Sequence, residues 1–466
     1  MKILLLRPNS EVPSAAPPQG LLSLAAYVRK YGDHQIEIFD GRGRESRPSE
    51  IAQAIKTAKP DLVGITSFSM EYKEAHQCAA MAKEIFPRSP VVMGGPYPTS
   101  QHQDALQDSN IDAVVIGEGE KTGLLLFNAL EKGEKLDDIP GLAFRRNGNL
   151  VQNPPVEYIV DLDEIPFPAW ELLDLELYFT HRGKKRKTMN QHQLKTRVLQ
   201  ISTSRGCPYH CAYCHNLFGK QIRKRSVENV IEELKLLKSK YAVEEMEIID
   251  DIFNLDLERA KEIFRRVTEE KLDLKFSFPN GLRSDRLDEE FLDVMKQAGV
   301  YRIVFAIESG SPRIQKLIKK NVKLDVAQKN IELAEKRGFS LGGFFMLGFP
   351  TETEEEVRNT IDFALNSKLA TATFFMVTPF PGTDIHNMAL QLGYDLPKEY
   401  EHYQKVSLNV SNVPTPTLET LRSRAMRKFY LNPRRIWRYV RTTPWRYRFF
   451  EKIYIFIMVT LFKYEK

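Results

Sequence analysis

Two long stretches of the chain alternate short apolar runs with helical patterns, and this alternation constrains the fold more than any other feature. In residues 1–135, the first run, Lys2–Leu6, is apolar after its lysine and suits a strand buried on both faces. Helical spacing follows in Leu21–Arg29. Strands that alternate with helices predict a doubly wound parallel sheet, which is a Rossmann-like α/β fold. The later runs in this stretch are Gln35–Phe39, Leu62–Ile65, Val91–Met93 and Ala113–Ile116.

A second series of strand–helix units begins at Val198. Eight such units would close a TIM barrel of about 250 residues, so six predict a partial (β/α)6 barrel of the TIM type. Parallel sheets bind ligands at the carboxyl ends of their strands, so we expect functional residues directly after these runs. The six runs are Val198–Thr203, Glu245–Ile249, Lys275–Pro279, Arg302–Ile307, Phe344–Leu347 and Thr373–Thr378.

The patterns predict four parts in the 466-residue chain, which is long enough for two or three domains with their own cores. The connector carries a basic run, Arg182–Lys187, which is either a solvated loop or a site for an anion. The predicted parts are a Rossmann-like domain (1–138), the connector (139–195), the partial barrel (196–395) and a basic helical C-terminal region (396–466).

Three of the four cysteines lie within eight residues, in Cys207-Pro-Tyr-His-Cys211-Ala-Tyr-Cys214. Four cysteines in a chain of this length exclude a disulfide framework. Three thiolates on one loop suit three corners of a cubane iron–sulfur cluster and leave one iron open for a ligand. The alternative is a zinc site that uses His210 or His215, although zinc usually takes two ligand pairs far apart in sequence.

This spacing, with an aromatic residue before the last cysteine, is typical of one family. Residues 198–385 resemble the radical S-adenosylmethionine enzymes, and Tyr213 is the aromatic residue. The resemblance implies a 4Fe-4S cluster on Cys207, Cys211 and Cys214, which would act as both metal ligands and catalytic residues. The open iron would chelate S-adenosylmethionine, and reductive cleavage would yield a 5′-deoxyadenosyl radical.

Later strand ends resemble the family's S-adenosylmethionine contacts. Asp250-Asp251 follows the second strand, where a carboxylate suits the methionine ammonium, although many members have Gly-Gly-Glu there. Glu308-Ser309 ends the fourth strand, and Gly348 and Pro350 follow the fifth. Two alternatives remain open: the aspartates form a helix N-cap, and Gly348–Pro350 is a plain turn.

The first domain resembles the cobalamin-binding domain fused to one large class of these enzymes. Glycines at strand ends would let the main chain approach a bulky macrocycle. No Asp-x-His-x-x-Gly loop is found, so a histidine from the chain is not expected to ligate cobalt. A scaffold that has lost its ligand is the alternative, and a dinucleotide site is disfavoured because no G-x-G-x-x-G follows the first strand. The candidate cobalamin contacts are Asn9, Ser10, Gly20, Leu21, Thr66, Ser67, Phe68, Gly94, Gly95, Pro96, Tyr97, Thr99, Gly117, Glu118, Gly119 and Glu120.

The remaining cysteine, Cys78, lies in a predicted helix and is interpreted as a buried, unreactive thiol. It also separates this chain from the tRNA methylthiotransferases. Those proteins resemble the predicted barrel, but they carry three additional cluster cysteines in the N-terminal domain.

The net charge of +6 is carried by the C-terminal end of the chain. Residues 421–466 hold 13 basic and two acidic residues, interleaved with aromatic ones. The apolar run Ile453–Phe462 is too short to span a bilayer, so the end suits an anionic membrane surface. The alternative is a helical lid that packs on the barrel. RNA binding is disfavoured by the apolar run.

Together with these patterns, the two resemblances imply a cobalamin-dependent radical enzyme that methylates an unactivated carbon of an apolar or natural-product substrate. Oxidative cyclisation, ring contraction and rearrangement, as in porphyrin or hopanoid enzymes, are alternatives within the same architecture. A non-catalytic cobalamin-responsive binding protein is the alternative of another class. We expect a flavodoxin or ferredoxin as electron donor and no nucleic acid. The N-terminal apolar run is too short for a signal peptide, so a cytoplasmic location, with peripheral contact to the inner membrane face, is expected.

Overall fold

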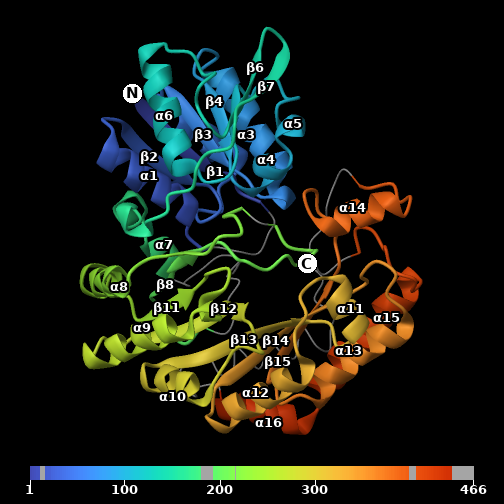
Figure 1. The fold of residues 1–466 in the computed structure, drawn as a ribbon. Coiled ribbons are helices and arrows are strands. Elements are labelled where there is room, and N and C mark those ends of the chain that lie inside the picture. Colours follow the sequence, from blue (N-terminus) through green and yellow to red (C-terminus); the bar gives the residue numbers. More distant parts are fainter. Residues whose placement is uncertain (11–15, 180–192, 216, 398–405, 443–466) are drawn as a thin grey trace. The chain divides into compact units, whose positions relative to one another are not determined.

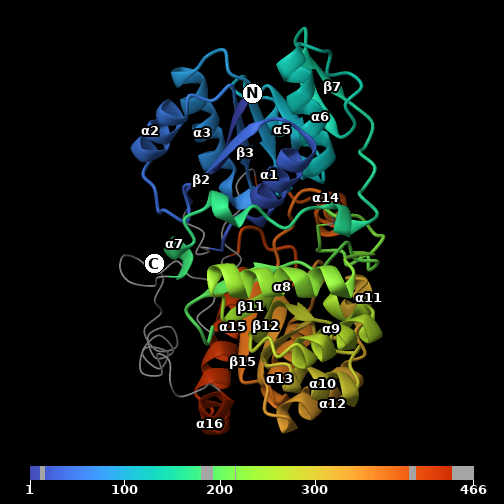
Figure 2. The same ribbon diagram turned by 90° about the vertical axis from the view of Figure 1, so that its left-hand side faces the viewer.

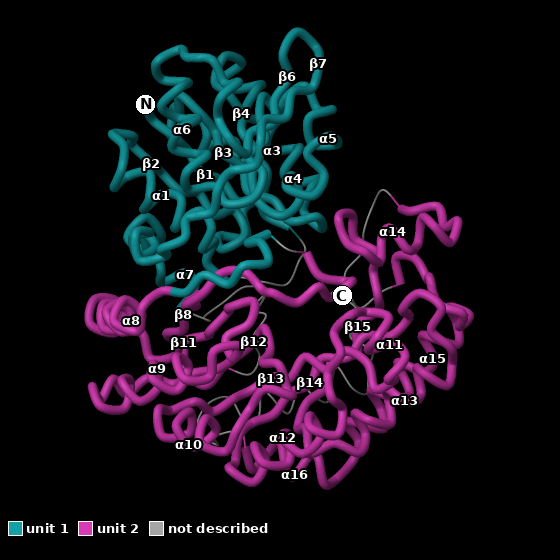
Figure 3. Tube along the Cα trace, viewed as in Figure 1, with its two compact units in different colours: residues 1–189, 216–224 teal, residues 190–215, 225–466 magenta. Residues whose placement is uncertain are grey.

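A computed structural model describes residues 1–10, 16–179, 193–215, 217–397 and 406–442. The chain forms two compact units, which are coloured separately in Figure 3. Unit 1 contains residues 1–189 and 216–224, and unit 2 contains residues 190–215 and 225–466. Each unit is described by itself.

Unit 1 is built on a seven-stranded sheet in the order β2-β1-β3-β4-β5-β6-β7 (Figure 1). Strands β1 to β5 pair in parallel, and β6 and β7 add an antiparallel hairpin. The elements are β1 Lys2–Arg7, α1 Gln19–Tyr31, β2 Gln35–Asp40, α2 Pro48–Ala58, β3 Leu62–Thr66, α3 Tyr72–Ile85, β4 Val91–Gly94, α4 Pro96–Ser100, α5 His102–Ala105, β5 Ala113–Val115, α6 Gly119–Lys132, β6 Leu142–Arg146, β7 Asn149–Gln152, α7 Glu176–Phe179 and β10 Arg223–Lys224, with short 3-10 turns at Ser69–Glu71, Leu162–Glu164 and Trp170–Leu172.

The central strand β1 shows why the sheet is covered on both faces. Its side chains alternate between the two faces of the sheet. Leu4 and Leu6 belong to one buried cluster, together with residues of α2 and α3. Ile3 and Leu5 belong to a second cluster on the other face, together with residues of α1 and α6. The unbroken apolar run therefore becomes a doubly wound α/β layer, as the sequence predicts.

Unit 2 is a six-stranded parallel sheet in the order β15-β14-β13-β12-β11-β8, with helices outside it (Figure 2). The order follows the chain from β8 to β15, which confirms the predicted partial (β/α)6 barrel. The elements are β8 Val198–Ile201, β9 Ser204–Arg205, α8 Val227–Tyr241, β11 Glu245–Ile248, α9 Leu257–Glu269, β12 Lys275–Leu282, α10 Glu289–Gln297, β13 Val300–Glu308, α11 Pro312–Leu317, α12 Leu324–Lys336, β14 Ser340–Leu347, α13 Glu354–Asn366, β15 Thr371–Met376, α14 Asp384–Gln391, α15 Thr415–Tyr430 and α16 Pro433–Thr442, with a 3-10 turn at Phe253–Leu255.

The structure differs from the sequence analysis within the segment 139–195, for which only a connector was predicted. Residues 142–152 form the β6–β7 hairpin, which extends the sheet of unit 1 beyond β5. The prolines that favour a connector, such as Pro154 and Pro155, lie just after this hairpin. A tight turn at Asn147-Gly148, where both residues have positive φ, joins the two strands.

A barrel of six strands leaves edges, and α15 covers the one formed by β15. The hydroxyl of Tyr430 accepts from the Ala372 amide at 3.1 Å and donates to the Ala372 carbonyl at 2.8 Å. Nε of Arg422 donates to the Phe374 carbonyl at 2.8 Å. These bonds satisfy main-chain groups that have no further strand to pair with.

Helix α16 is attached to the barrel through Arg435, which is buried. Its guanidinium donates to the carbonyls of Leu369 at 2.7 Å and Ala364 at 2.9 Å, close to the start of β15. The same group lies 3.9 Å from the ring centroid of Phe429. The C-terminal region is therefore helical and packed on the barrel as far as Thr442. The run Ile453–Phe462 lies outside the described residues. No helix in the described ranges is long and apolar enough to cross a membrane.

We predict that Tyr430→Phe weakens the edge of the sheet without altering its core. Two main-chain groups of Ala372 lose their partner, which costs about 1–3 kcal/mol when such groups stay buried. Native-state hydrogen exchange should show faster exchange of the Ala372 amide. Tyr394→Phe is the control, because Tyr394 is a partly exposed tyrosine that follows α14 and has no contact with Ala372 among those of the described residues. Equal exchange of the Ala372 amide in the two variants would contradict the proposed role of Tyr430 in covering the β15 edge.

Candidate active site

The three-cysteine loop begins directly after the first barrel strand, β8. None of its cysteines forms a disulfide; Cys207 and Cys211 are partly buried and Cys214 is exposed. The middle of the loop is fixed by its main chain. The Ala212 amide donates to the Ile318 carbonyl at 2.9 Å, and the Ala212 carbonyl accepts from Ile385 at 2.9 Å. The loop after β8 is thus held between the end of α11, which follows β13, and the start of α14, which follows β15.

Asp250, at the end of β11, anchors the start of the loop. Its carboxylate accepts from the amide and hydroxyl of Thr203 and from the hydroxyl of Ser204, each at 2.6 Å. Burial raises the pKa of Asp250, and these hydrogen bonds oppose the rise. The neighbouring Asp251 is exposed and accepts from the Gly206 amide at 3.2 Å. The two aspartates are adjacent in the sequence, but Asp250 is buried and Asp251 is exposed.

Glu308 and Tyr213 meet a lysine that the sequence analysis did not single out. Oε1 of Glu308 accepts from Lys320 at 3.0 Å and from the Tyr213 hydroxyl at 3.2 Å. The Lys320 ammonium also lies 2.9 Å from the Tyr213 hydroxyl. Burial, and then the charge of Glu308, raise the pKa of Tyr213 well above its ordinary value. Glu308 has a φ of +69°, a strained conformation for a residue with a side chain.

Ser309 points into the protein, where its hydroxyl lies 3.1 Å from that of Thr360. Its carbonyl accepts from Gln315 at 2.6 Å. The side chain therefore supports the loop after β13, while the neighbouring carboxylate of Glu308 meets the cysteine loop.

Glu352 holds the loop after β14, and it too was missed from the sequence. One carboxylate oxygen accepts from the amides of Gly348 at 2.7 Å and Phe349 at 3.0 Å. The other oxygen, Oε1, is buried without a hydrogen bond to the described residues. Burial raises the pKa of Glu352 to about 8. Gly348 has a φ of +96°, so the turn requires glycine. Pro350 is buried in the same turn.

The donor set fits a cubane cluster better than a single metal ion. No group of three or more His, Cys, Asp or Glu side chains within the described ranges is close enough to hold one ion. A cubane distributes its three thiolates over three iron atoms, so it needs thiols that are near each other but separate. The protein atoms packed around the Cys214 thiol raise its pKa to about 12, and Cys211, Asp251 and Cys207 add to the rise.

In unit 1, the predicted cobalamin residues gather at the carboxyl edge of the parallel strands. A Cβ added to Gly20, Gly117 or Gly119 would meet no atom within 4 Å, so a ligand can approach the main chain there. Phe68 follows β3 and is 47% exposed, a large value for an aromatic side chain. Asn9, Thr66, Gly94, Pro96 and Thr99 have intermediate exposure along this edge. This open edge can accept a large planar ligand.

Other predicted cobalamin residues make internal contacts instead. Tyr97 belongs to a core cluster, and its hydroxyl lies 3.0 Å from Nε2 of His76. Glu118 forms a buried ion pair with Arg223, and Glu120 accepts from Ser23 at 2.8 Å. The remaining internal residues are Ser10, bonded to Glu71 at 3.1 Å, Ser67, bonded to the Phe68 carbonyl at 3.1 Å, Leu21, which is buried, and Gly95, where an added Cβ would lie 2.8 Å from Thr66 Oγ1.

The residues missed by the sequence analysis are mainly buried charges that support loops. Glu352 could have been predicted from its place in the sequence, four residues after Gly348. A buried turn needs an acceptor for its main-chain amides, and a nearby carboxylate can supply it. Lys320 gave no signal, since it is one of several lysines close together in the sequence, at 316, 319, 320 and 323. Cys78 is buried, as predicted, and burial raises the pKa of its thiol to about 12.

Two family models match the two α/β regions of the chain. The B12 binding domain matches residues 9–126, and the Radical SAM superfamily matches residues 201–364. The first match covers strands β2 to β5 of unit 1, and the second covers strands β11 to β14 of the barrel.

Curated relatives match almost the whole chain. An uncharacterized methyltransferase of Pyrococcus horikoshii is 36% identical over 445 residues and covers 93% of each chain. Cytidylyl-2-hydroxyethylphosphonate methyltransferase of Streptomyces wedmorensis is 31% identical, covering 89% of this chain and 86% of its own. Among solved structures, the methyltransferase TsrM of Kitasatospora setae, with cobalamin and a [4Fe-4S] cluster bound, has a TM-score of 0.69 at 22% identity and covers 84% of this chain and 75% of its own.

We predict that Glu352→Gln removes a pH dependence of stability. The folded-state pKa of Glu352, about 8, lies above the ordinary value of about 4.5, so the protonated form is favoured on folding. Its contribution to the free energy of unfolding is complete below about pH 4.5 and declines as the pH rises through 8. Between pH 5 and pH 9, chemical denaturation should show the wild type losing on the order of 3 kcal/mol more than the variant.

The matched control for this comparison is Glu355→Gln, an exposed carboxylate on α13. It should follow the wild-type pH profile. Parallel profiles for the wild type and Glu352→Gln would show that Glu352 does not titrate as its burial predicts.

Proposed function

We propose that this chain, which belongs to the cobalamin-dependent radical S-adenosylmethionine enzymes, transfers a methyl group to an unactivated carbon of its substrate. The observation that carries the proposal is the three-cysteine loop at the mouth of the barrel, in a chain that resembles methyltransferases over almost its full length. When bound, the cluster and S-adenosylmethionine supply a hydrogen-abstracting radical, and cobalamin supplies a methyl carrier.

We assign the cluster to Cys207, Cys211 and Cys214. Asp250 positions this loop, because its carboxylate accepts hydrogen bonds from Thr203 and Ser204. Asp251 is exposed and is the member of the pair that suits the methionine ammonium.

The other strand ends have separate tasks in this proposal. Glu352 shapes the main chain at Gly348 and Phe349, where an adenine would contact the backbone. Glu308, paired with Lys320, supports Tyr213 behind the cluster. Ser309 supports the loop after β13 from inside the protein.

We assign cobalamin to the open edge of unit 1. The main chain at Gly20, Gly117 and Gly119 would lie against the ligand, and the exposed ring of Phe68 offers a flat apolar contact. The internally bonded residues Tyr97, Glu118 and Glu120 hold this edge in shape.

We further propose an apolar or natural-product substrate, a flavodoxin or ferredoxin as electron donor, and a cytoplasmic enzyme whose C-terminal region contacts a membrane. The relative from Streptomyces wedmorensis is named for a phosphonate substrate, so a polar, nucleotide-linked substrate is a competing proposal. Metabolites from a deletion strain decide between them. Methyl transfer requires a compound that lacks one CH2 unit to accumulate, whereas a cyclase or rearrangement enzyme would leave a precursor that differs in hydrogen count or ring size.

We predict that Cys211→Ala abolishes the release of 5′-deoxyadenosine from S-adenosylmethionine under reducing, anaerobic conditions. Loss of one of three thiolates should also lower the iron content after reconstitution and remove the brown colour. Cys78→Ala is the matched control, because Cys78 is buried in α3 of the other unit. Iron binding and turnover that survive in Cys211→Ala would exclude the proposed cluster and favour a non-catalytic binding protein.

We also predict that the two neighbouring aspartates affect different kinetic quantities. Asp251→Asn should raise the KM for S-adenosylmethionine by roughly tenfold or more at full iron content, since it weakens an ion pair with the ligand. Asp250→Asn should instead reduce the iron content, because it loosens the start of the cysteine loop. Measured KM and iron per chain test both expectations. Identical phenotypes would refute the division of roles.

A further inference from the structure

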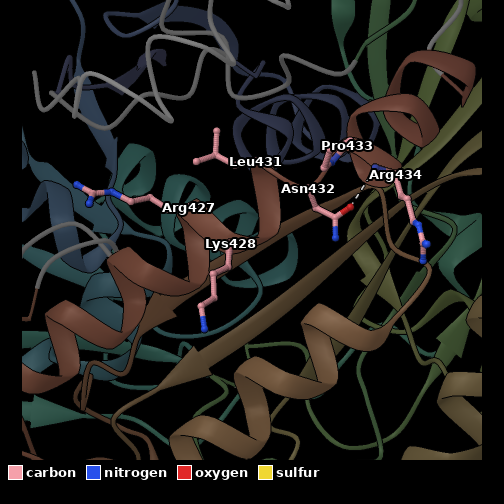
Figure 4. Close-up of a pocket in the computed structure, with 6 residues that line it drawn as sticks. All are labelled: Arg427, Lys428, Leu431, Asn432, Pro433 and Arg434. Carbon is pink, nitrogen blue, oxygen red and sulfur yellow. Dashed lines mark hydrogen bonds between the residues drawn. The ribbon is translucent and has the colours of Figure 1, made fainter.

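The turn between α15 and α16 forms a surface that is both cationic and apolar. A cavity of about 610 Å³ lies there, lined by Arg427, Lys428, Leu431, Asn432, Pro433 and Arg434 (Figure 4). Leu431 is 51% exposed, and Trp437, on the first turns of α16, is 66% exposed. We call Arg427, Lys428, Leu431, Arg434 and Trp437 the α15–α16 surface. These residues bring positive charge and exposed apolar side chains together at one turn of the chain.

The charge of this surface is not neutralised within the described part of the chain. Residues 420–442 contain eight arginines and lysines and no acidic residue. Four of the eight are used internally. Arg422 and Arg435 bind main-chain carbonyls, and Arg438 and Arg441 pair with Glu335. The other four, Arg424, Arg427, Lys428 and Arg434, are exposed and have no acidic partner among the described residues. The last three line the cavity beside Leu431.

We propose that the α15–α16 surface binds the headgroups of an anionic membrane. Cations around exposed Leu and Trp side chains match the layered chemistry of a bilayer interface, where charge lies outside and apolar contact inside. Trp favours this depth, because its ring is apolar and its N–H can stay hydrated. A nucleic acid would satisfy the cations but would leave Leu431 in water.

An acidic electron carrier is another partner that could bind a cationic surface. The position of this surface on the barrel argues against such a carrier and favours a membrane. Arg435 bonds to carbonyls just before β15 begins, so α16 lies at the amino ends of the strands. The cysteine loop follows the carboxyl end of β8. The strand β14 has eight residues and spans about 26 Å, so the two ends are far apart. Electron transfer slows steeply with distance, and a carrier docked here would be poorly placed to reduce a cluster.

One consequence is that membrane contact orients the barrel. With the α15–α16 surface on the bilayer, the end of the barrel that carries the cysteine loop points away from it. The surface then acts as an anchor, and substrate reaches the site from the aqueous side. This inference is independent of the proposed methyl transfer, since it concerns only helices at the opposite end of the barrel.

The test measures binding of the full chain to vesicles of phosphatidylcholine, alone or mixed with phosphatidylglycerol, by co-sedimentation. Each cation near an anionic surface contributes a factor of about 5 to partitioning. The triple change Arg427→Gln, Lys428→Gln and Arg434→Gln should therefore weaken binding to the anionic vesicles on the order of a hundredfold. The matched control changes three exposed lysines on other parts of unit 2 and should bind like wild type: Lys240→Gln, Lys271→Gln and Lys316→Gln.

The same samples report the orientation. Hydrogen exchange on anionic vesicles should slow in residues 424–441 and stay unchanged in the cysteine loop, 207–214. Undiminished vesicle binding in the triple variant overturns the proposal, as does an equal loss in the lysine control. Binding to neutral vesicles at the same strength, tighter binding to an RNA oligonucleotide, or protection of the cysteine loop on vesicles overturns it as well.

Discussion

Parallel pairing is the constraint on which the rest of this structure depends. When neighbouring strands run in the same direction, every connection that follows a strand emerges at one edge of the sheet. Residues separated by more than a hundred positions, such as Cys207 and Gly348, are thereby brought to the same end of unit 2. Unit 1 applies the same rule to its glycine-rich turns. The residues of each site need not be close in sequence, because the parallel direction of the strands places the loops that follow them at one edge.

Buried carboxylates then fix the conformation of the loops at this edge of the barrel. Asp250, Glu308 and Glu352 each end or follow a different barrel strand, and each accepts hydrogen bonds from a loop. A carboxylate inside a protein is costly unless it is hydrogen-bonded, so each one fixes its donors strongly. Three loops are therefore held by three separate acceptors. The exposed carboxylate of Asp251 lies beside them and accepts from the Gly206 amide.

The sequence predicts the α/β class, the six-stranded partial barrel and the positions of strand ends, because apolar periodicity records burial directly. It also identifies Cys207, Cys211 and Cys214 as candidate cluster ligands, because their spacing is a pattern within one loop. It does not reveal Lys320 beside Glu308, since that contact joins two elements through space. It pairs Asp250 with Asp251, yet their side chains point to different partners. It also assigns Tyr97 to a ligand, whereas helix packing turns that ring into the core.

Helix α15 covers the edge strand β15 through side chains that form hydrogen bonds with main-chain atoms of the strand. Such bonds do not depend on which side chains β15 carries. Substitutions along β15 can therefore reshape the barrel interior, where a substrate would be selected, while the edge stays closed. The helix and the strand can diverge separately in evolution.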